Sequence, residues 1–441
     1  MLEGQSKFSR EGPLSAWLVS WLMLFQRLSP AGTLKAAVGE IRLGSARKLV
    51  RPPVGKKTTK KKKKKLSRST SAYSQARTKL PLVVAETVSD LIFESRLGEP
   101  KTLPGLGLPM FLLDGSSIQL QHTPALVQAY PPSKNRHGES HWPVMRILVA
   151  HDVVTGLALR PEYGPMYGPK AVSEQGLAKK MIGRLLKRSV AMGDRNFGIF
   201  SIVYHVQLHD HLGLFRLTDQ RAAKVNGSVT PNAGTDRRVR WTPSRWDLRS
   251  NPEIPADACV EGRLLAFKLR DEDGKPIKLY LFTTLDLPAD EILKLYGYRW
   301  YVETDLRSLK RDAGLHRLTA KSVAMVAKEL VLGVAAYNLV RGTISDAATA
   351  LNCDPRRFSF SQALQLINEY LPAFAYAANE AERQELRVDM LEAFAQSKIP
   401  RRRKSRSFPR EIWPPPCSFP TRKAGGKESA PLEKSEEKKV A

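Results

Sequence analysis

The chain has 441 residues, 42% of them apolar, and its 71 Lys and Arg against 43 Asp and Glu give a net charge of +28. That length is typical of two or three domains. So large a positive surplus favours a polyanionic partner, most often nucleic acid, over an acidic membrane surface. The three cysteines are widely spaced, which argues against a disulfide framework or a thiolate zinc site and fits a reducing compartment.

We interpret residues 1–100 as an N-terminal helical, DNA-binding region with a lysine-rich linker at 51–70. The apolar run Leu14–Phe25 is too short to span a bilayer, and it predicts a buried helix rather than a signal peptide. The linker contains eight lysines between Lys56 and Lys65, which repel one another. It is either a solvated tether or an arm that binds phosphates, and the candidate residues are Lys60, Lys61, Lys62 and Lys63.

A helical pattern returns at residues 71–97, where Val84, Leu91 and Leu97 suit one buried face. From about residue 105 the pattern changes to short apolar runs mixed with one helix, which predicts an α/β sheet. The predicted strands are 110–115, 189–194, 213–218 and a hairpin of 144–152 with 155–161, and the predicted helix is 172–188.

Residues 221–285 are rich in aromatic and turn residues and predict a β-rich insertion that ends in a hairpin at 263–285. One long helix is expected over Ala289–Ala313, followed by helices to about residue 395. The predicted domains are therefore a core in two parts, 105–220 and 286–345, with the insertion between them and C-terminal helices at 346–400. A basic, disordered tail is expected at 401–441, with Arg401, Arg402 and Arg403 as candidate DNA-binding residues.

Two aspartates follow predicted strands, which is where α/β sheets carry their ligands. Asp114 follows the run 111–113, and Asp194 follows the run 190–193. Each has a plain alternative reading, because "DG" is a common turn and "GDR" suits a helix cap.

One glutamate, Glu303, lies on the predicted helix 289–313. At 100° per residue it shares a polar stripe with Tyr296, Arg299, Arg307 and Lys310, next to a core-facing stripe. Asp305 points about 200° away and cannot share its role. The alternative reading is surface ion pairing of Glu303 with arginines one turn away, worth a few tenths of a kcal/mol.

Three carboxylates suit a hard divalent cation, because Mg²⁺ prefers oxygen ligands and is held by a few carboxylates together with substrate phosphates. Two such ions about 3.5–4 Å apart can stabilise both the entering and the leaving oxygen in phosphoryl transfer. The sequence therefore predicts a site for Mg²⁺, or Mn²⁺ in its place, that acts on phosphodiesters.

The spacing Tyr296-x2-Arg299-x3-Glu303-x6-Lys310 resembles the Y-(2)-R-(3)-E-(6)-K signature of cut-and-paste DDE transposases of bacterial insertion sequences, in the family numbered four. The likeness runs from about residue 66 to 410. Further matching segments are "SAYSQARTKL" (71–80), "LLDGSSIQL" (112–120), "GDRNFG" (193–198) and the segment 314–341. Asn196 departs from the glycine that the family often has there.

The resemblance implies a ribonuclease-H-like catalytic core, with a β-rich insertion, an N-terminal helical domain and a C-terminal helical region. It implies Asp114, Asp194 and Glu303 as the catalytic, metal-binding triad. It also implies DNA contacts by Tyr296, Arg299 and Lys310. Arg307, on the same polar stripe, is a further candidate for DNA contact. Trp241 and Trp246 are candidates to stack on a flipped base, although both also suit the core of a small β domain.

The implied reaction is Mg²⁺-dependent cleavage at element ends and transfer of the freed 3′-OH into target DNA, in many relatives through a DNA hairpin. Implied partners are double-stranded DNA, as terminal inverted repeats and as target, and a second subunit in a synaptic dimer, with no membrane. The expected location is the cytoplasm, in association with the nucleoid. Two rival functions stay open: a nuclease on the same core without strand transfer, and a decayed copy that only binds DNA.

Overall fold

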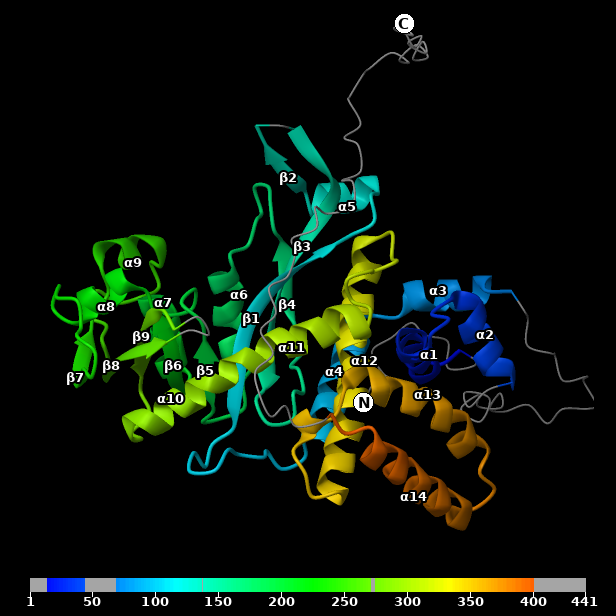
Figure 1. Ribbon diagram of the computed structural model, residues 1–441. Coiled ribbons are helices and arrows are strands. Elements are labelled where there is room, and N and C mark those ends of the chain that lie inside the picture. Colours follow the sequence, from blue (N-terminus) through cyan, green and yellow to red (C-terminus); the bar gives the residue numbers. More distant parts are fainter. Residues whose placement is uncertain (1–13, 44–68, 137, 271–273, 400–441) are drawn as a thin grey trace, which may run out of the picture.

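A nine-stranded mixed sheet forms the centre of the computed structural model, which describes residues 14–43, 69–136, 138–270 and 274–399 (Figure 1). The strand order is β2-β3-β1-β5-β6-β9-β8-β7, with β4 on β3. The central pairs β1–β5 and β5–β6 are parallel, and the others are antiparallel. The strands are β1 (Met110–Gln119), β2 (Pro132–Asn135), β3 (Gly138–Asp152), β4 (Glu162–Pro165), β5 (Val190–Gly193), β6 (Leu212–Leu217), β7 (Asp236–Trp241), β8 (Val260–Arg270) and β9 (Pro276–Thr283).

Strand β1 shows how the sheet builds two cores. Successive side chains of a strand point to opposite faces, so a strand covered on both sides is apolar at consecutive positions. Phe111 and Leu113 enter one buried cluster, while Met110 and Leu112 enter the other. The run is therefore buried on both faces up to Asp114, the first polar position of the strand.

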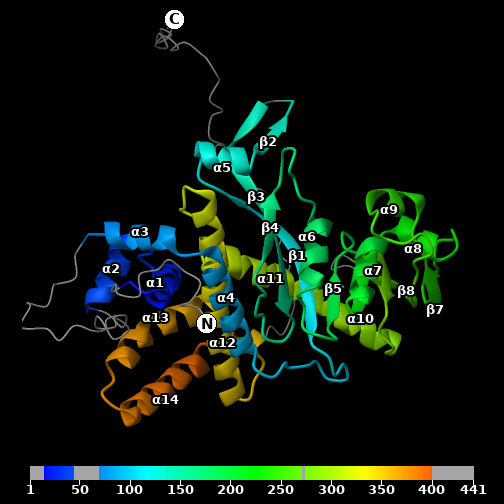
Figure 2. The same ribbon diagram turned by 180° about the vertical axis from the view of Figure 1, so that it is seen from behind.

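Helices cover the two faces of the sheet separately. The helices α6 and α7 lie over the cluster that includes Phe111, and Figure 2 shows them in front of the strands. The helical stretch from α10 to α11 crosses the opposite face (Figure 1). The shorter helices of this half are α5 (Pro124–Ala129), α6 (Glu174–Ile182), α7 (Phe200–Leu208), α8 (Asp219–Val225), α9 (Arg245–Ser250), α10 (Ala289–Gly297) and α11 (Tyr301–Arg307).

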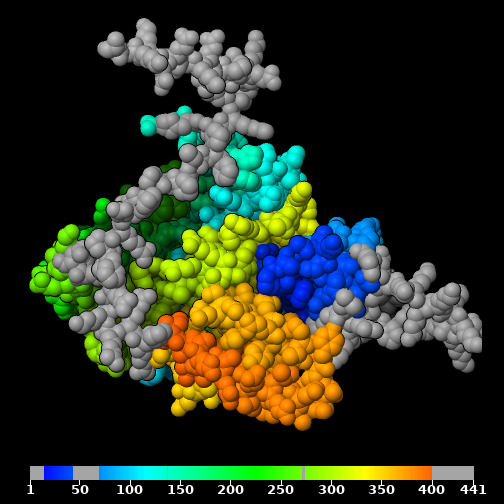
Figure 3. Space-filling model, turned by 45° about the vertical axis from the view of Figure 1, so that its right-hand side comes forward, coloured from blue at the N-terminus to red at the C-terminus, as the bar shows by residue number. Residues whose placement is uncertain are grey.

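The long helix α12 (Val323–Ala350) joins the sheet to the helical remainder of the chain. It is apolar and long enough to cross a membrane by length and composition, but 78% of its most apolar window is buried inside the protein. It contacts α1, α3, α4, α13 and α14, and Figure 3 shows the blue N-terminal helices beside the orange C-terminal ones. These helices are α1 (Ala16–Leu28), α2 (Leu34–Leu43), α3 (Ser71–Lys79), α4 (Leu82–Leu97), α13 (Phe360–Tyr376) and α14 (Glu380–Gln396).

The α/β fold class is confirmed, and so is the burial of the apolar N-terminal run, because Leu18, Val19 and Leu22 of α1 are buried. The predicted strand 155–161 is wrong. It makes only the bridge between Ala158 and His151, and β4 is the regular partner of β3. Leu91 does not belong to the buried face of α4, since its side chain is 45% exposed.

The segment read as a β-rich insertion is continuous with the sheet. Strand β9 pairs with β6, and β8 and β7 follow it to the edge of the same sheet. The segment also contributes the helices α8 and α9. The predicted basic residues Lys60, Lys61, Lys62, Lys63, Arg401, Arg402 and Arg403 lie outside the described residues.

The prediction of one regular α-helix over Ala289–Ala313 is wrong, because the stretch is helical but changes its type along its length. A 3₁₀ turn, Tyr298–Trp300, separates α10 from α11, and a π-helix, Ser308–Asp312, follows α11. Each change of pitch rotates the residues beyond it away from the directions of an ideal helix.

Candidate active site

The strand ends bring Asp114 and Asp194 together. Strands β1 and β5 are parallel with Leu112 opposite Met192, so two residues further on each chain reaches its aspartate. Because side chains alternate between faces, each aspartate points to the same face as the residue two positions before it. Leu112 and Met192 both lie in the cluster that α11 covers. The sheet therefore presents two adjacent carboxylates toward the helix that carries Glu303.

The charge around Asp114 is unfavourable for a carboxylate. Burial raises its pKa, Glu174 and Asp194 raise it further, and the Gly115 N–H and Arg299 lower it, with a result of about 7. The Gly115 N–H donates to Asp114 Oδ1 at 2.9 Å. Asp194 Oδ1 accepts from the Asn196 N–H at 2.8 Å, which orders the turn after β5. The ends of β1 and β5 thus concentrate negative charge that a cation would offset.

Glu303 lies on α11 but does not yet join the two aspartates. Its carboxylate is 44% exposed and pairs with Arg299 at 3.6 Å, one helical turn earlier. The Arg299 charge also acts on Asp114, so this guanidinium faces both sides of the site. The local pairing that the sequence suggested as an alternative for Glu303 is thus present.

The three carboxylates are suitable ligands for a divalent metal, but in this structure they do not lie close enough together to bind one. Carboxylate oxygens are the ligands that Mg²⁺ prefers, and the charge crowded around Asp114 favours a cation. Within the described residues, however, no three His, Cys, Asp or Glu side chains are grouped closely enough to hold one. Asp114 and Asp194 form one side of such a site, and Glu303 would have to turn away from Arg299 to complete it.

Two of the signature residues contact the site from opposite ends of the helical stretch. Tyr296 is buried, and burial raises its pKa to about 12, with Arg299, Arg216 and Asp194 as its charged neighbours. Lys310, in the π-helix, donates to Ser116 Oγ at 3.0 Å, two residues beyond Asp114 on β1. Arg307 is exposed.

A fourth carboxylate, Glu174, was missed by the sequence analysis. It is the first residue of α6, which Ser173 caps by accepting from the Gly176 N–H. Asn196 donates to its Oε2, and a Cβ added at Gly115 would lie 1.6 Å from its Oε1. Burial, and then Asp194, raise the pKa of Glu174. The only sequence signal was a glutamate behind a helix cap, which by itself indicates a helix start.

The two candidate tryptophans differ in their surroundings. Trp241, on β7, is only 9% exposed, and its ring packs at 5.0 Å from Phe282 and 6.0 Å from Phe200. Trp246, on α9, is 67% exposed. Both line a cavity of about 680 Å³ that Arg221 and Lys224 also border. The geometry places Trp241 in the core and leaves Trp246 as the exposed aromatic surface.

Comparison with known proteins places this site in a family context. Residues 106–339 match the family model of the transposase DDE domain. The chain is also similar to the transposase InsG for insertion sequence element IS4 of Escherichia coli (strain K12). The two are 24% identical over 320 residues, which cover 71% of this chain and 70% of the relative.

Proposed function

Because this chain belongs to the IS4 family of DDE transposases, which act on DNA, we propose that it cuts phosphodiester bonds at element ends and joins the freed 3′-OH to target DNA. The proposed metal-binding and catalytic residues are Asp114, Asp194 and Glu303. The observation that carries the proposal is the register of β1 and β5, which sets two aspartates side by side on the face that α11 covers.

DDE transposases depend on a divalent metal ion, and we propose Mg²⁺, with Mn²⁺ able to substitute. When bound, such ions lower the pKa of an attacking water and stabilise the entering and leaving oxygens of the phosphate. The chain's own part is to offer carboxylate oxygens from β1 and β5 and to release Glu303 from Arg299. The freed guanidinium then suits a bidentate contact with the DNA phosphate.

The residues around the carboxylates support a contact with the DNA backbone. The Tyr296 hydroxyl is buried and has no hydrogen-bond partner within the described part of the chain, so we propose that it donates to a phosphate oxygen once DNA binding opens this position. We assign phosphate contacts to Tyr296, Arg299 and Lys310, and a more peripheral one to the exposed Arg307. The basic residues of the linker and tail, Lys60, Lys61, Lys62, Lys63, Arg401, Arg402 and Arg403, extend this charge in our proposal.

We further propose a cut-and-paste reaction with a hairpin step. The supporting feature is Trp246, whose exposed ring borders a cavity next to Arg221 and Lys224. An aromatic face with basic neighbours suits an unstacked base and its phosphates. The proposal also includes a homodimer that pairs two element ends, and action at the bacterial nucleoid.

The test replaces Glu303 by Gln, with Glu291→Gln as the matched control, since Glu291 is an exposed glutamate of the adjacent helix α10. We expect E303Q to lose cleavage of end DNA by a factor of about 10³ or more and to keep DNA binding, whereas E291Q keeps both. Unchanged cleavage by E303Q would reject the assignment.

A second assay separates the full reaction from its rivals. Pre-cleaved ends are incubated with supercoiled target DNA, and joined products are measured on a gel. Cleavage without joining would indicate a nuclease on this core, and binding without either activity would indicate a protein that only binds DNA.

A further inference from the structure

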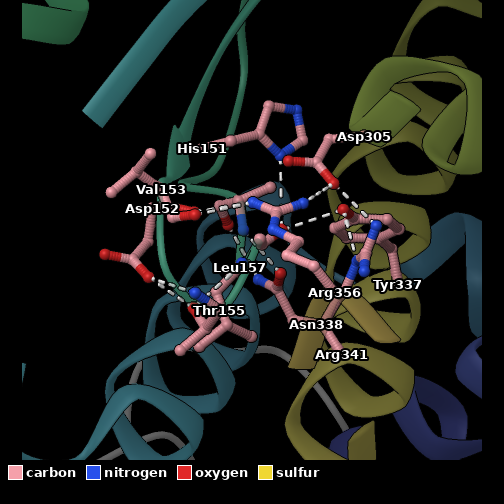
Figure 4. Close-up of polar contacts among 12 residues, drawn as sticks. His151, Asp152, Val153, Thr155, Leu157, Asp305, Tyr337, Asn338, Arg341 and Arg356 are labelled. Carbon is pink, nitrogen blue, oxygen red and sulfur yellow. Dashed lines mark hydrogen bonds and ion pairs between the residues drawn. The ribbon is translucent and has the colours of Figure 1, made fainter. Parts of the chain in front are cut away.

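A buried ion cluster lies directly behind the proposed catalytic glutamate. Asp305, two residues after Glu303, has no solvent exposure, and its Oδ1 accepts from Arg341 Nη2 and Arg356 Nη1, both at 2.6 Å (Figure 4). The two arginine side chains are 3% and 10% exposed. We call Asp305, Arg341 and Arg356 the arginine clasp.

The clasp connects three separate parts of the chain. Asp305 belongs to α11, Arg341 to α12, and Arg356 to the 3₁₀ helix Pro355–Arg357. Arg356 Nη2 also donates to the Val153 carbonyl at 2.9 Å, just beyond the end of β3. Its guanidinium carbon lies 4.5 Å from the ring centre of Tyr301, the first residue of α11. Arg356 thereby holds α11 at two residues and the end of β3 at a third.

The turn after β3 is fitted to the clasp. Gly156 has φ +75°, and a Cβ there would lie 3.1 Å from Arg341 Nε, from Arg356 Nη1 and from Asp305 Oδ1. Tyr337 OH donates to the Gly156 carbonyl at 2.8 Å and accepts from Arg341 Nε at 2.9 Å. Atoms of all three clasp residues therefore surround the space that a side chain at Gly156, in the turn after β3, would occupy.

This arrangement fixes the catalytic helix relative to the sheet that bears the aspartates. Residues 144–152 of β3 pair with β1, with Asp114 opposite Val149. The clasp thus anchors α11 to the neighbour of the strand that carries Asp114, and the Lys310–Ser116 hydrogen bond anchors the following π-helix to β1 itself. Glu303 lies at the start of a segment held at both of these points.

We propose that the arginine clasp positions Glu303 against Asp114 and Asp194, so that Asp305, Arg341 and Arg356 are positioning residues for the reaction. The inference rests on the proposed function. Three buried charged groups are weak evidence for stability, because apolar residues of similar volume often stabilise as well or better. The clasp instead fixes the orientation of α11, since two guanidinium groups hold the Asp305 carboxylate in one place.

The experiment maps which backbone segments lie beside the bound metal. The full chain is loaded with Fe²⁺ in place of Mg²⁺, and ascorbate and peroxide generate hydroxyl radicals that cut nearby backbone. In the wild type we expect cuts at the 114 and 194 segments and in α11. In Asp305→Asn and in the milder Arg356→Lys we expect the α11 cuts to be lost and the strand cuts to remain.

A matched control is available in the same long helix. Glu329 is also a buried carboxylate bridged by two arginines, Arg77 at 2.8 Å and Arg27 at 3.8 Å. It lies twelve positions before Arg341, roughly 18 Å along α12. Glu329→Gln removes a comparable buried pair, so it should lower the melting temperature while keeping the α11 cuts.

The outcomes separate the two proposals. Absence of the triad cuts in the wild type overturns the proposed function itself. If the wild type shows these cuts, two results would overturn the clasp inference. One is that the α11 cuts persist in a folded clasp variant, and the other is that they vanish equally in E329Q. As a parallel readout, single-turnover cleavage should fall about 10²-fold in the clasp variants while the Kd for end DNA stays within about twofold, as expected for a misplaced catalytic group.

Discussion

Asp114 carries the most unusual charge environment among the residues of the site. It meets two other carboxylates, Glu174 and Asp194, in a partly buried position at a strand end. In the absence of a cation its ionised form is costly, so Asp114 stays protonated to a higher pH than an ordinary aspartate. The same crowding that destabilises the free site makes a bound divalent cation favourable there.

This environment predicts a pH-dependent stability. The pKa of Asp114 in the folded protein is about 7, raised from the ordinary value of 3.8 that applies in the unfolded chain. This contribution to stability is therefore fully present below the unfolded pKa and is lost as pH rises through the folded pKa of about 7. In metal-free buffer, Asp114→Asn should therefore stabilise the protein by roughly 2–4 kcal/mol at pH 8 and little at pH 4. Chemical denaturation at both pH values measures it. Equal effects of D114N at the two pH values would contradict the assignment.

At the scale of elements, the sheet was largely predictable and the helical stretch that carries Glu303 was not. The runs before Asp114 and Asp194 are apolar on both faces, and that pattern fixes a central strand regardless of partners. The strand at 155–161 failed because the turn after β3 is shaped by Gly156 and by arginines far along the sequence, which local periodicity does not contain. The breaks around α11 failed for the same reason.

The site shows the same limit. Spacing predicted that Glu303 shares one helix face with basic residues, since a helix converts sequence distance into a face, and Glu303 does pair with Arg299. It could not identify Glu174, whose approach to Gly115 depends on how α6 docks on β1. Asp305 was expected to point away from Glu303, and it does, but its two arginine partners come from α12 and the turn after it.

The contact between α6 and β1 gives a prediction at this scale. In Gly115→Ala the new Cβ would lie 1.6 Å from Glu174 Oε1, so Glu174 must move and Asp114 beside it shifts. We expect single-turnover cleavage to fall about 10-fold to 10²-fold in G115A. The double variant Gly115→Ala/Glu174→Ala removes the clash and should recover part of the rate. A double variant no faster than G115A would show that the contact is not the cause.

At the scale of the molecule, α12 connects the N-terminal helices to the sheet. Arg77 of α3 donates to Glu329 on α12 at 2.8 Å, and Arg27 of α1 donates to the Gly314 carbonyl, after the π-helix, at 2.9 Å. On the other side, Asn338 of α12 exchanges two hydrogen bonds with Ala158 beside β3. One buried helix therefore bonds both to the N-terminal region and to the segment that follows β3 of the central sheet.

This connection predicts that the two regions unfold together. Leu22 of α1 is fully buried in the cluster that includes α12, and Leu22→Ala should lower the free energy of unfolding by about 2–5 kcal/mol. Loss of α1 helicity and loss of metal binding by the core should then occur at one denaturant concentration. Trp17→Ala, at a 52% exposed position of the same helix, should change stability by less than about 1 kcal/mol. Two separate transitions in L22A would refute the coupling.

The burial of α12 also affects how transposases of this kind can diversify by recombination. A transposase that acquired new N-terminal helices by recombination with a relative would inherit a surface shaped for a different central helix, with Glu329 or Gly314 lacking their arginines. Exchange of the N-terminal helices alone should therefore yield poorly folded hybrids. Viable mosaics should therefore exchange the N-terminal helices together with α12, so that Glu329 keeps both of its arginines.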